Sequence, residues 1–538
     1  MANPSAQPSA DQGSVLRRLI DVGIALSAER NHDRLMERIL VEAKAIYNAD
    51  GGTLYLKDEE SLSFAIMRND TLGIAMGGTT GDKVPFAPLA LRDPATNEPN
   101  HHNVATHVAI TGALVNIPDA YSEAGFDFSG AVNFDKRTGY RSKSFLTVPL
   151  KNYEGQVVGV LQLINARDQT NTVVPFDLAT QSLVEALSSQ AAVALDNRQL
   201  LEGQKKLLDS FVQLIATAID RKSPYTSGHC QRVPVLADMI ADAACAASSG
   251  PFADFDLTDD ERYEIHMAAW MHDCGKVTTP EYVMDKSTKL ETIFDRIHTV
   301  QTRFTVLQRD AEITYLKGKL ANEGTEAERK AELDATLARL EQERAFIEAA
   351  NIGGEFLADE KIERIKQVAA QRWRDWTGKE QPFLSENEVY NLSIRKGTLN
   401  NEERKIISDH VVVTIEMLQQ LPFPRNLRRV PEFAGGHHER MDGKGYPKGL
   451  KREDMSIPAR IMAIADIYEA LTAADRPYKK AMTLSQSLKI MEKMQAEGHI
   501  DSDLFHLFVE AGVYRRYAET HLKPEQLDQV DERELLSA

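Results

Sequence analysis

The stretch His272-Asp273-Cys274-Gly275-Lys276 decides how the second half of this chain is interpreted. It places an imidazole, a neutral nitrogen ligand for metals, next to a carboxylate that can bridge two metal ions. Chance alone should place about one His-Asp pair in a soluble chain of this size. The five residues therefore suggest a hydrolytic metal site, and the rest of the chain must support it.

Further imidazole and carboxylate side chains stand on both sides of this stretch. His229 lies upstream, and His410, the pair His437-His438 and Asp466 lie downstream. These are the ligand types expected of a hard or borderline divalent metal. The set therefore strengthens the interpretation of a metal site.

Each residue of the motif has an expected role. Asp273 could bridge two ions, His272 could take a terminal position, and Lys276 could offset charge on a phosphoryl oxygen. Gly275 is expected to end the preceding helix in a left-handed turn that folds Lys276 back toward the site. A surface ion pair between Asp273 and Lys276 is the alternative. Cys274 is expected to be a packing residue.

Composition narrows the class of protein. A chain of 538 residues should form two or more domains, and its net charge of −17 argues against binding to duplex nucleic acid. Its three cysteines provide no disulfide framework, so we expect a reducing compartment and a cytoplasmic location. The polar N-terminus and the absence of about eighteen consecutive apolar residues predict neither export nor membrane insertion.

The first third of the chain predicts an antiparallel sheet with bracketing helices. After a flexible leader, 1–14, helical periodicity runs over 15–47. Short apolar or alternating runs then predict strands at 52–56, 62–67, 113–117, 144–150 and 156–163. Asn152-Tyr153-Glu154-Gly155 is a good hairpin turn between the last two.

A long helix is predicted from Phe176 to about Asp220, with 198–222 linking two domains. Such a helix often pairs with its copy in a homodimer, because it cannot bury its apolar stripe alone. Packing on its own domains is the alternative. From Ser223 to about residue 530, nearly the whole chain is predicted to be helical. Residues 531–538 are predicted to form a tail. Within the helical region, about 291–391 predicts an inserted helical hairpin with a turn at Asn322-Glu323-Gly324, for a structural or protein-binding role.

The motifs of the second half together resemble the HD-GYP phosphodiesterases of the HD superfamily. The resemblance covers 223–530 outside the insertion. It rests on His229, His272-Asp273, Lys276, His410, His437-His438, Gly445-Tyr446-Pro447, Asp466 and Asp475-Arg476-Pro477-Tyr478-Lys479. It implies an all-helical metallohydrolase domain that hydrolyses cyclic di-GMP to linear pGpG, and in some members on to GMP, with iron or manganese as the metal.

The resemblance also implies individual roles. The implied metal ligands are His229, His272, Asp273, His410, His437, His438 and Asp466. Asp273 and Lys276 would be catalytic, with Lys276 contacting the scissile phosphate or assisting proton transfer. The implied substrate-binding residues are Lys276, Gly445, Tyr446, Arg476 and Lys479.

Two positions depart from the family pattern. Ser223 stands where many members have an aspartate, which removes one proton acceptor near the nucleophile. Tyr225 stands where members with a third metal can carry glutamate, so the resemblance favours two divalent metal ions over three. Two alternatives stay open: an HD phosphohydrolase for another cyclic dinucleotide or nucleotide, and a weakly catalytic dinucleotide receptor or scaffold.

Residues 15–197 resemble a GAF sensory domain. The segment from Phe134 to Ser144, leading into the strand at 145–150, is similar to GAF domains of cyclic nucleotide phosphodiesterases. Asn165 begins their Asn-Lys-Phe-Asp-Glu pattern, but Ala166 replaces its lysine. A small regulatory ligand and a ligand-free dimerisation module are both open. The chain as a whole is thus expected to be a multidomain α+β protein, with a GAF-type domain regulating an all-α catalytic domain through the linker helix.

The remaining histidines are expected to be ordinary. His266 lies six residues before His272 and should face elsewhere on its helix. His101, His102 and His107 have no carboxylate or thiol near them in sequence. They are expected to form a polar loop.

Overall fold

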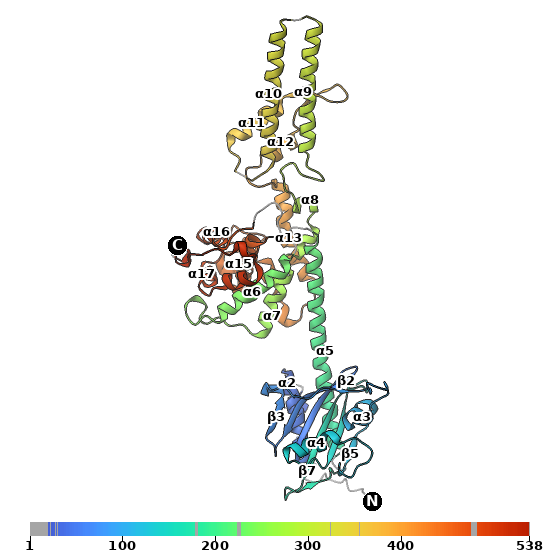
Figure 1. Ribbon diagram of the computed structural model, residues 1–538. Helices are drawn as coiled ribbons and strands as arrows, with labels where there is room; N and C mark the ends of the chain where they lie inside the picture. The colour runs from blue at the N-terminus through green and yellow to red at the C-terminus, as the bar shows by residue number, and fades with distance from the viewer. Residues whose placement is uncertain are drawn as a thin grey trace, which may run out of the picture. The chain divides into compact units, whose positions relative to one another are not determined.

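The computed structural model describes residues 20–536 except 22, 27, 30, 178–180, 223–227, 323, 355 and 475–480. The chain divides into two compact units, Met1–Leu207 and Leu208–Ala538 (Figure 1). The predicted leader lies outside the described residues. Among the helices that are described, none combines the length and apolar character that crossing a membrane requires.

An antiparallel sheet forms the centre of the first unit. Its main strands run in the order β3-β2-β1-β7-β6-β5, with β4 paired to β2 and β8 paired to β7. The strands are β1 Ala49–Lys57, β2 Ser61–Asn69, β3 Ile74–Gly77, β4 Leu89–Ala90, β5 Val115–Ile117, β6 Phe145–Lys151, β7 Val157–Arg167 and β8 Val173–Val174. All five predicted strands are confirmed. The sequence missed β3, β4 and β8, which are too short to show a period.

The turn between β6 and β7 also follows the prediction. Asn152 N–H donates to Gln156 O at 2.9 Å, and Gly155 has a φ of 78°. That left-handed conformation suits glycine.

Helices cover the sheet of the first unit. They are α2 His32–Tyr47, α3 Val104–Thr111, α4 Ser129–Thr138 and the first part of α5 Gln181–Asp220. The prediction of one continuous helix over 15–47 is wrong, because Asn31 is extended and caps α2 by accepting from Arg34 N–H at 2.9 Å. An asparagine side chain that satisfies a free amide starts a new helix there.

The core of the first unit lies between these helices and the sheet. The apolar side chains of α2, such as Ile39 and Leu40, pack with Leu54 and Leu161 of the sheet and with Leu187 of α5. The predicted periodicity of this part of the chain therefore corresponds to buried contacts.

The 40-residue helix α5 contributes to both units, and the chain passes from one to the other within it. Val184, Leu187, Ala191 and Leu195 are buried in the first unit. Val212 and Ile219 are buried in the second. The structure thus confirms the long helix predicted to reach about Asp220.

The second unit is built around one helical core. Its helices outside the insertion are α6 His229–Cys245, α7 Asp259–Met271, α8 Glu281–Met284, α13 Asn401–Gln419, α14 Val430–Gly435, α15 Ile457–Thr472, α16 Leu484–Ala496, α17 Ser502–Glu510, α18 Val513–His521 and α19 Glu532–Leu536. Large side chains such as Phe433, Tyr468 and Phe508 fill this core. The predicted all-helical character is confirmed here.

The insertion has a smaller core of its own. Its elements are α9 Ile297–Leu320, α10 Glu326–Asn351, α11 Asp359–Ala370, β9 Arg372–Arg374, β10 Glu380–Pro382 and α12 Glu386–Leu392. Helices α9 and α10 lie side by side (Figure 1). Asn322 and Gly324, with φ of 53° and 68°, form the turn between them. The two-stranded ribbon was not predicted.

Gly275 corrects one expectation about the motif. It does not adopt a left-handed turn, because residues Cys274–Thr278 continue as the 3-10 helix η4. A Cβ at this position would lie 2.0 Å from His410 O and 2.7 Å from Thr414 N. Gly275 N–H also donates to Thr414 Oγ1 at 2.9 Å. Glycine is needed so that η4 can lie directly against the backbone of α13.

We predict that Gly275→Ala lowers the stability of the second unit by about 3 kcal/mol, since the added methyl meets backbone that cannot move aside. Differential scanning calorimetry of the full chain would measure the shift. Gly203→Ala on α5 is the control. It meets no atom within 4 Å and should stabilise its helix by up to about 1 kcal/mol. Equal transitions for Gly275→Ala and the parent protein would contradict this account of the close packing.

Candidate active site and ligand cavity

The seven predicted metal ligands gather in one place in the second unit. His229 is the first residue of α6, and His272 and Asp273 follow α7 directly. His410 lies on α13 and Asp466 on α15, and the pair His437-His438 comes shortly after α14. Residues separated by more than 200 positions in the sequence thus meet in one buried cluster.

Asp273 stands at the centre of this cluster. Its Oδ2 lies 3.4 Å from His229 Nε2 and 3.4 Å from His272 Nε2. Its Oδ1 lies 3.2 Å from His410 Nε2 and 3.9 Å from His437 Nε2. The two carboxylate oxygens therefore face different histidines, as a bridging ligand requires. Asp466 Oδ1 lies near the histidines that face Asp273 Oδ2, at 3.2 Å from His229 Nε2.

Backbone carbonyls orient three of the histidines in the same way. The Nδ1–H of His272 donates to Ala269 O at 2.7 Å, and that of His437 donates to Ala434 O at 2.5 Å. His410 makes the same bond to Ile407 O. Because Nδ1 carries the proton, the lone pair of each ring is on Nε2, which points toward Asp273.

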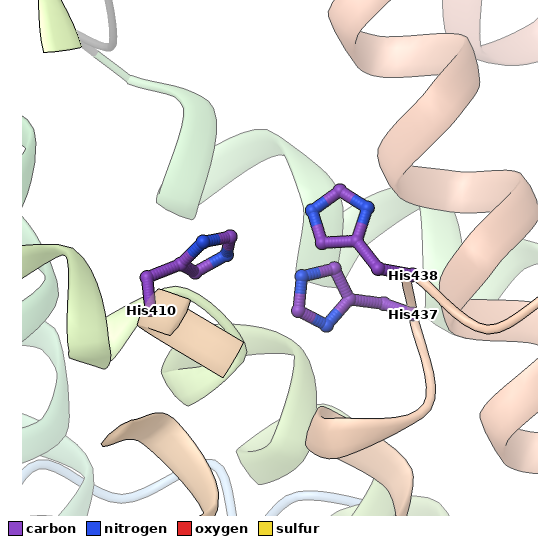
Figure 2. A group of neighbouring side chains, drawn as sticks. All are labelled: His410, His437 and His438. Carbon is purple, nitrogen blue, oxygen red and sulfur yellow. The ribbon is translucent and has the colours of Figure 1, made fainter. Parts of the chain in front are cut away.

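Unsatisfied buried atoms show that this cluster fits cations. Asp273 Oδ1, His410 Nε2 and His437 Nε2 are buried and form no hydrogen bond. Buried polar atoms without partners are rare because they cost free energy. Ligand atoms of His410, His437 and His438 lie within 4.8 Å of one another, as do those of His229, His272 and Asp273. Figure 2 shows His410 facing His437 and His438 across a common space.

The protonation states of His437, His438 and Asp273 favour metal binding. Burial, together with the neighbouring His438, holds the pKa of His437 well below its usual value, and burial lowers the pKa of His438 to about 4. Both rings are therefore neutral and have a free lone pair. Burial alone would raise the pKa of Asp273, but the charge of the Lys276 ammonium holds it well below the ordinary range, so Asp273 is a carboxylate.

Lys276 lies at the edge of the same cluster. Its Nζ donates to Asp273 Oδ2, and its side chain is about a quarter exposed. Burial opposes its charge, but Asp273 and Asp466 raise its pKa above the ordinary lysine value. A charged ammonium therefore lies beside Asp273 at the edge of the cluster.

The predicted substrate loop also reaches this cluster. The ring of Tyr446 stacks on His438 with centroids 4.8 Å apart and planes 23° apart. Gly445 allows close packing, since a Cβ there would lie 2.4 Å from Arg440 N. Arg476 and Lys479, and the departures Ser223 and Tyr225, lie outside the described residues.

Comparison with known proteins agrees with this arrangement. Residues 386–504 match the HD domain family model, and residues 31–195 match the GAF domain family model. The chain contains an HD domain and an N-terminal GAF domain. The HD match includes His410, His437, His438 and Asp466 but begins after the motif at His272, which the fold brings to the same cluster.

Individual relatives are similar over shorter stretches. One is a 3'3'-cGAMP-specific phosphodiesterase of Vibrio cholerae, 41% identical over 21% of this chain and 26% of the relative. Another is a cyclic di-GMP phosphodiesterase of Pseudomonas aeruginosa, 46% identical over 14% of this chain and 18% of the relative. A cGMP-specific 3',5'-cyclic phosphodiesterase of Drosophila mojavensis is 25% identical over 55% of this chain and 25% of the relative. Each alignment spans less than a third of the relative.

Two buried glutamates of the HD domain were missed by the sequence analysis. Glu439 accepts from Lys448 N–H at 2.7 Å and Leu450 N–H at 2.9 Å, which holds the loop that carries Tyr446. Glu469 accepts from His229 Nδ1–H and from Arg232 Nε at 2.6 Å. Glu439 directly follows His438, and Glu469 lies one helical turn after Asp466. Their spacing to the ligands was the only available sign.

Glu469 supports His229 as the backbone carbonyls support the other histidines. Its carboxylate fixes the proton on Nδ1, and Nε2 would then be available to bind a metal. Arg232 in turn balances the buried charge of Glu469, whose residue is 1% exposed. Glu469 is therefore a positioning residue for the cluster.

We predict that Glu469→Ala weakens Mn²⁺ binding about 10- to 100-fold, the usual cost of losing such support. Titration of metal-free protein against a chelating dye would measure the affinity. Glu469→Gln should keep part of it, because the amide oxygen can still accept from His229. Glu510→Ala, at the exposed end of α17, is the control. An unchanged affinity in Glu469→Ala would refute the positioning role.

The expectations for His266 and Cys274 are confirmed, whereas the predicted polar loop of His101, His102 and His107 is wrong for His107, which lies on α3. His266 faces away from the cluster, with Nδ1 2.7 Å from Asp238 Oδ2 and Nε2 accepting from Trp270 Nε1. Cys274 is buried, and burial raises the pKa of its thiol to about 11, so it is an unreactive packing residue.

The GAF domain encloses a cavity of about 500 Å³. Phe134, Arg137, Tyr140 and Ser142 of the segment singled out in the sequence line it, as does His102. Asn165 accepts from Lys143 N–H at 2.8 Å and donates to Arg141 O at 2.8 Å. This asparagine therefore holds the lining segment in place.

Proposed function

We propose that this chain is a metal-dependent phosphodiesterase that hydrolyses cyclic di-GMP to linear pGpG, with GMP as the alternative final product. The observation that carries the proposal is the buried cluster around Asp273, with Lys276 and Tyr446 at its edge. A cyclic dinucleotide offers two phosphodiesters and two purine bases. The cluster offers cation ligands and the Lys276 ammonium for one phosphodiester. The aromatic ring of Tyr446 is available for one base.

The cluster would hold two divalent metal ions, with iron or manganese suited to its mixed imidazole and carboxylate ligands. Its proposed ligands are His229, His272, Asp273, His410, His437, His438 and Asp466. When bound, such ions supply an activated water and stabilise charge on phosphoryl oxygens. Lys276 would bind an oxygen of the scissile phosphate. Arg476 and Lys479 remain the proposed contacts of the second phosphate.

The relatives support a cyclic dinucleotide as substrate and leave its bases open. One is named for 3'3'-cGAMP and another for cyclic di-GMP. The two substrates differ in a single purine. We favour cyclic di-GMP on the HD-GYP resemblance, and a direct comparison of the two decides between them.

We predict that protein purified without oxygen, with its metals determined, converts cyclic di-GMP to the linear dinucleotide. Asp273→Ala should reduce the rate by about 100-fold or more, because the bridging carboxylate is lost. Asp259→Ala, an exposed aspartate at the start of α7, should leave the rate unchanged. Chromatography of the products, with 3'3'-cGAMP tested in parallel, measures these rates.

Each other outcome has a defined meaning. Faster turnover of 3'3'-cGAMP would reassign the substrate within the same reaction. Tight binding of cyclic di-GMP without metal-dependent turnover would favour the receptor or scaffold. Full activity in Asp273→Ala would overturn the assigned site.

We also propose that the GAF domain regulates hydrolysis through α5, with a small ligand in its 500 Å³ cavity as input. The C-terminal end of α5 supports this, because Asp220 and, just beyond the helix, Lys222 bind the site's framework. Asp220 accepts from Gly228 N–H and Cys230 N–H at 3.1 and 3.2 Å, on either side of His229. Lys222, just beyond the helix, donates to Val277 O at 2.5 Å and Thr279 O at 2.7 Å, after the HD motif.

We predict that Lys222→Met lowers the catalytic rate by roughly 10-fold, the scale of one charge-assisted hydrogen bond, because residues 276–279 lose their anchor. Bound metal should stay the same, since no ligand changes. Arg221→Met, the exposed neighbour, is the control. Steady-state kinetics and metal analysis measure both quantities. An unaltered rate in Lys222→Met would remove the proposed link between α5 and the motif.

A homodimer through α5 is part of the same proposal. Val193, Leu200, Leu207 and Leu214 are spaced by seven residues and are between 43% and 63% exposed. A seven-residue apolar repeat is the pattern of paired helices. The helical insertion, where Leu316 and Leu320 are exposed, remains a proposed protein-binding element. The cytoplasmic location stays a prediction.

A further inference from the structure

Lys289, where the chain enters the insertion, carries a buried charge with few partners. Lys289 is only 1% exposed, and its Nζ donates to Leu392 O at 3.2 Å. Within the described part of the chain, no carboxylate pairs with it. An ammonium has three donors and a full charge, so one carbonyl leaves it poorly satisfied.

Lys286, three residues earlier, is another buried lysine, and its partners can be compared with those of Lys289. Its Nζ lies 2.8 Å from both carboxylate oxygens of Glu403 and 3.3 Å from Asn391 Oδ1. The two lysines share a short segment and a similar burial. Among the described residues, Glu403 neutralises Lys286 and no carboxylate neutralises Lys289.

Lys289 is one of the residues that line a cavity in the insertion. This cavity of about 330 Å³ is lined by Lys289 and Lys361 and by the apolar side chains of Phe346, Ile352, Phe356 and Leu357. This volume is in the range of small-molecule sites, which combine an apolar lining with a few polar groups. Burial, with a contribution from Lys361, lowers the pKa of Lys289 to about 8, so the side chain is still charged at neutral pH and an anion beside it would stabilise that charge.

We propose that this cavity binds a small carboxylate with an apolar body, with the carboxylate on Lys289 and the body against Phe346 and Leu357. A carboxylate fits better than a phosphate. Its single charge matches one buried ammonium, and the described residues of the lining include no arginine to bind a phosphate in a bidentate manner. The site uses no residue of the metal cluster. It is independent of the proposed hydrolysis.

Isothermal titration of the full-length protein with octanoate tests the proposal. Octanol, which has the same chain without the charge, is the matched ligand control. Octanoate should bind at least about 10-fold more tightly than octanol. Lys289→Met, which keeps the length of the side chain without its charge, should remove this difference.

Two further variants separate the site from general effects. Ala349 lines the cavity, so Ala349→Phe should abolish octanoate binding with Lys289 intact. Lys366→Met, on the exposed face of α11, should leave binding unchanged. Circular dichroism verifies that each variant is folded.

The proposal is overturned if millimolar octanoate does not bind the parent protein. Equal affinity for octanoate and octanol would also overturn it, as would full octanoate affinity in Lys289→Met or Ala349→Phe. Because none of these measurements depends on turnover of cyclic di-GMP, failure of the hydrolysis proposal would leave this one standing.

Discussion

The structure of the second unit depends on one constraint, the burial of the Asp273 carboxylate among histidine nitrogens. A buried carboxylate is costly unless positive charge or hydrogen-bond donors surround it. Here Lys276 supplies one charge, but the surrounding imidazoles turn lone pairs toward Asp273, and its Oδ1 forms no hydrogen bond. Acceptors face acceptors, and cations between them would resolve that conflict. The metal centre is therefore inferred from the energetics of burial as well as from the residue types.

The helices are built to hold this arrangement. His272, His410 and His437 each bond to a carbonyl three residues earlier in their own helical segment, so local helix geometry fixes the tautomer. Gly275 then lets η4 approach α13 closely enough to bring Asp273 within 3.2 Å of His410. A methyl group at position 275 would separate the two halves of the cluster. Packing and chemistry thus depend on the same contact.

The sequence predicted the candidate metal ligands, but it did not predict the residues that position them. Histidine and aspartate are rare enough, and chemically distinct enough, for their order along the chain to predict a metal site. Glu439 and Glu469 were missed because glutamate is common and its burial depends on tertiary packing. Gly275 was predicted to be special for its backbone angle, whereas the structure requires it for space, and only the position of α13 could reveal this. In the first unit, periodicity predicted the five main strands and missed those of two to four residues, β3, β4 and β8.

The same argument from burial applies at the base of the insertion and distinguishes structural charges from functional ones. Glu469 is buried between His229 and Arg232, and Lys286 is buried against Glu403, so both charges are neutralised within the fold. Lys289 and the Asp273 cluster are not neutralised in this way by the residues that the structure describes. If such groups served only the stability of the fold, apolar side chains of similar size in their place would make the protein more stable. Incompletely satisfied burial at two separate places is therefore best explained by two ligands: cations at Asp273 and an anion at Lys289.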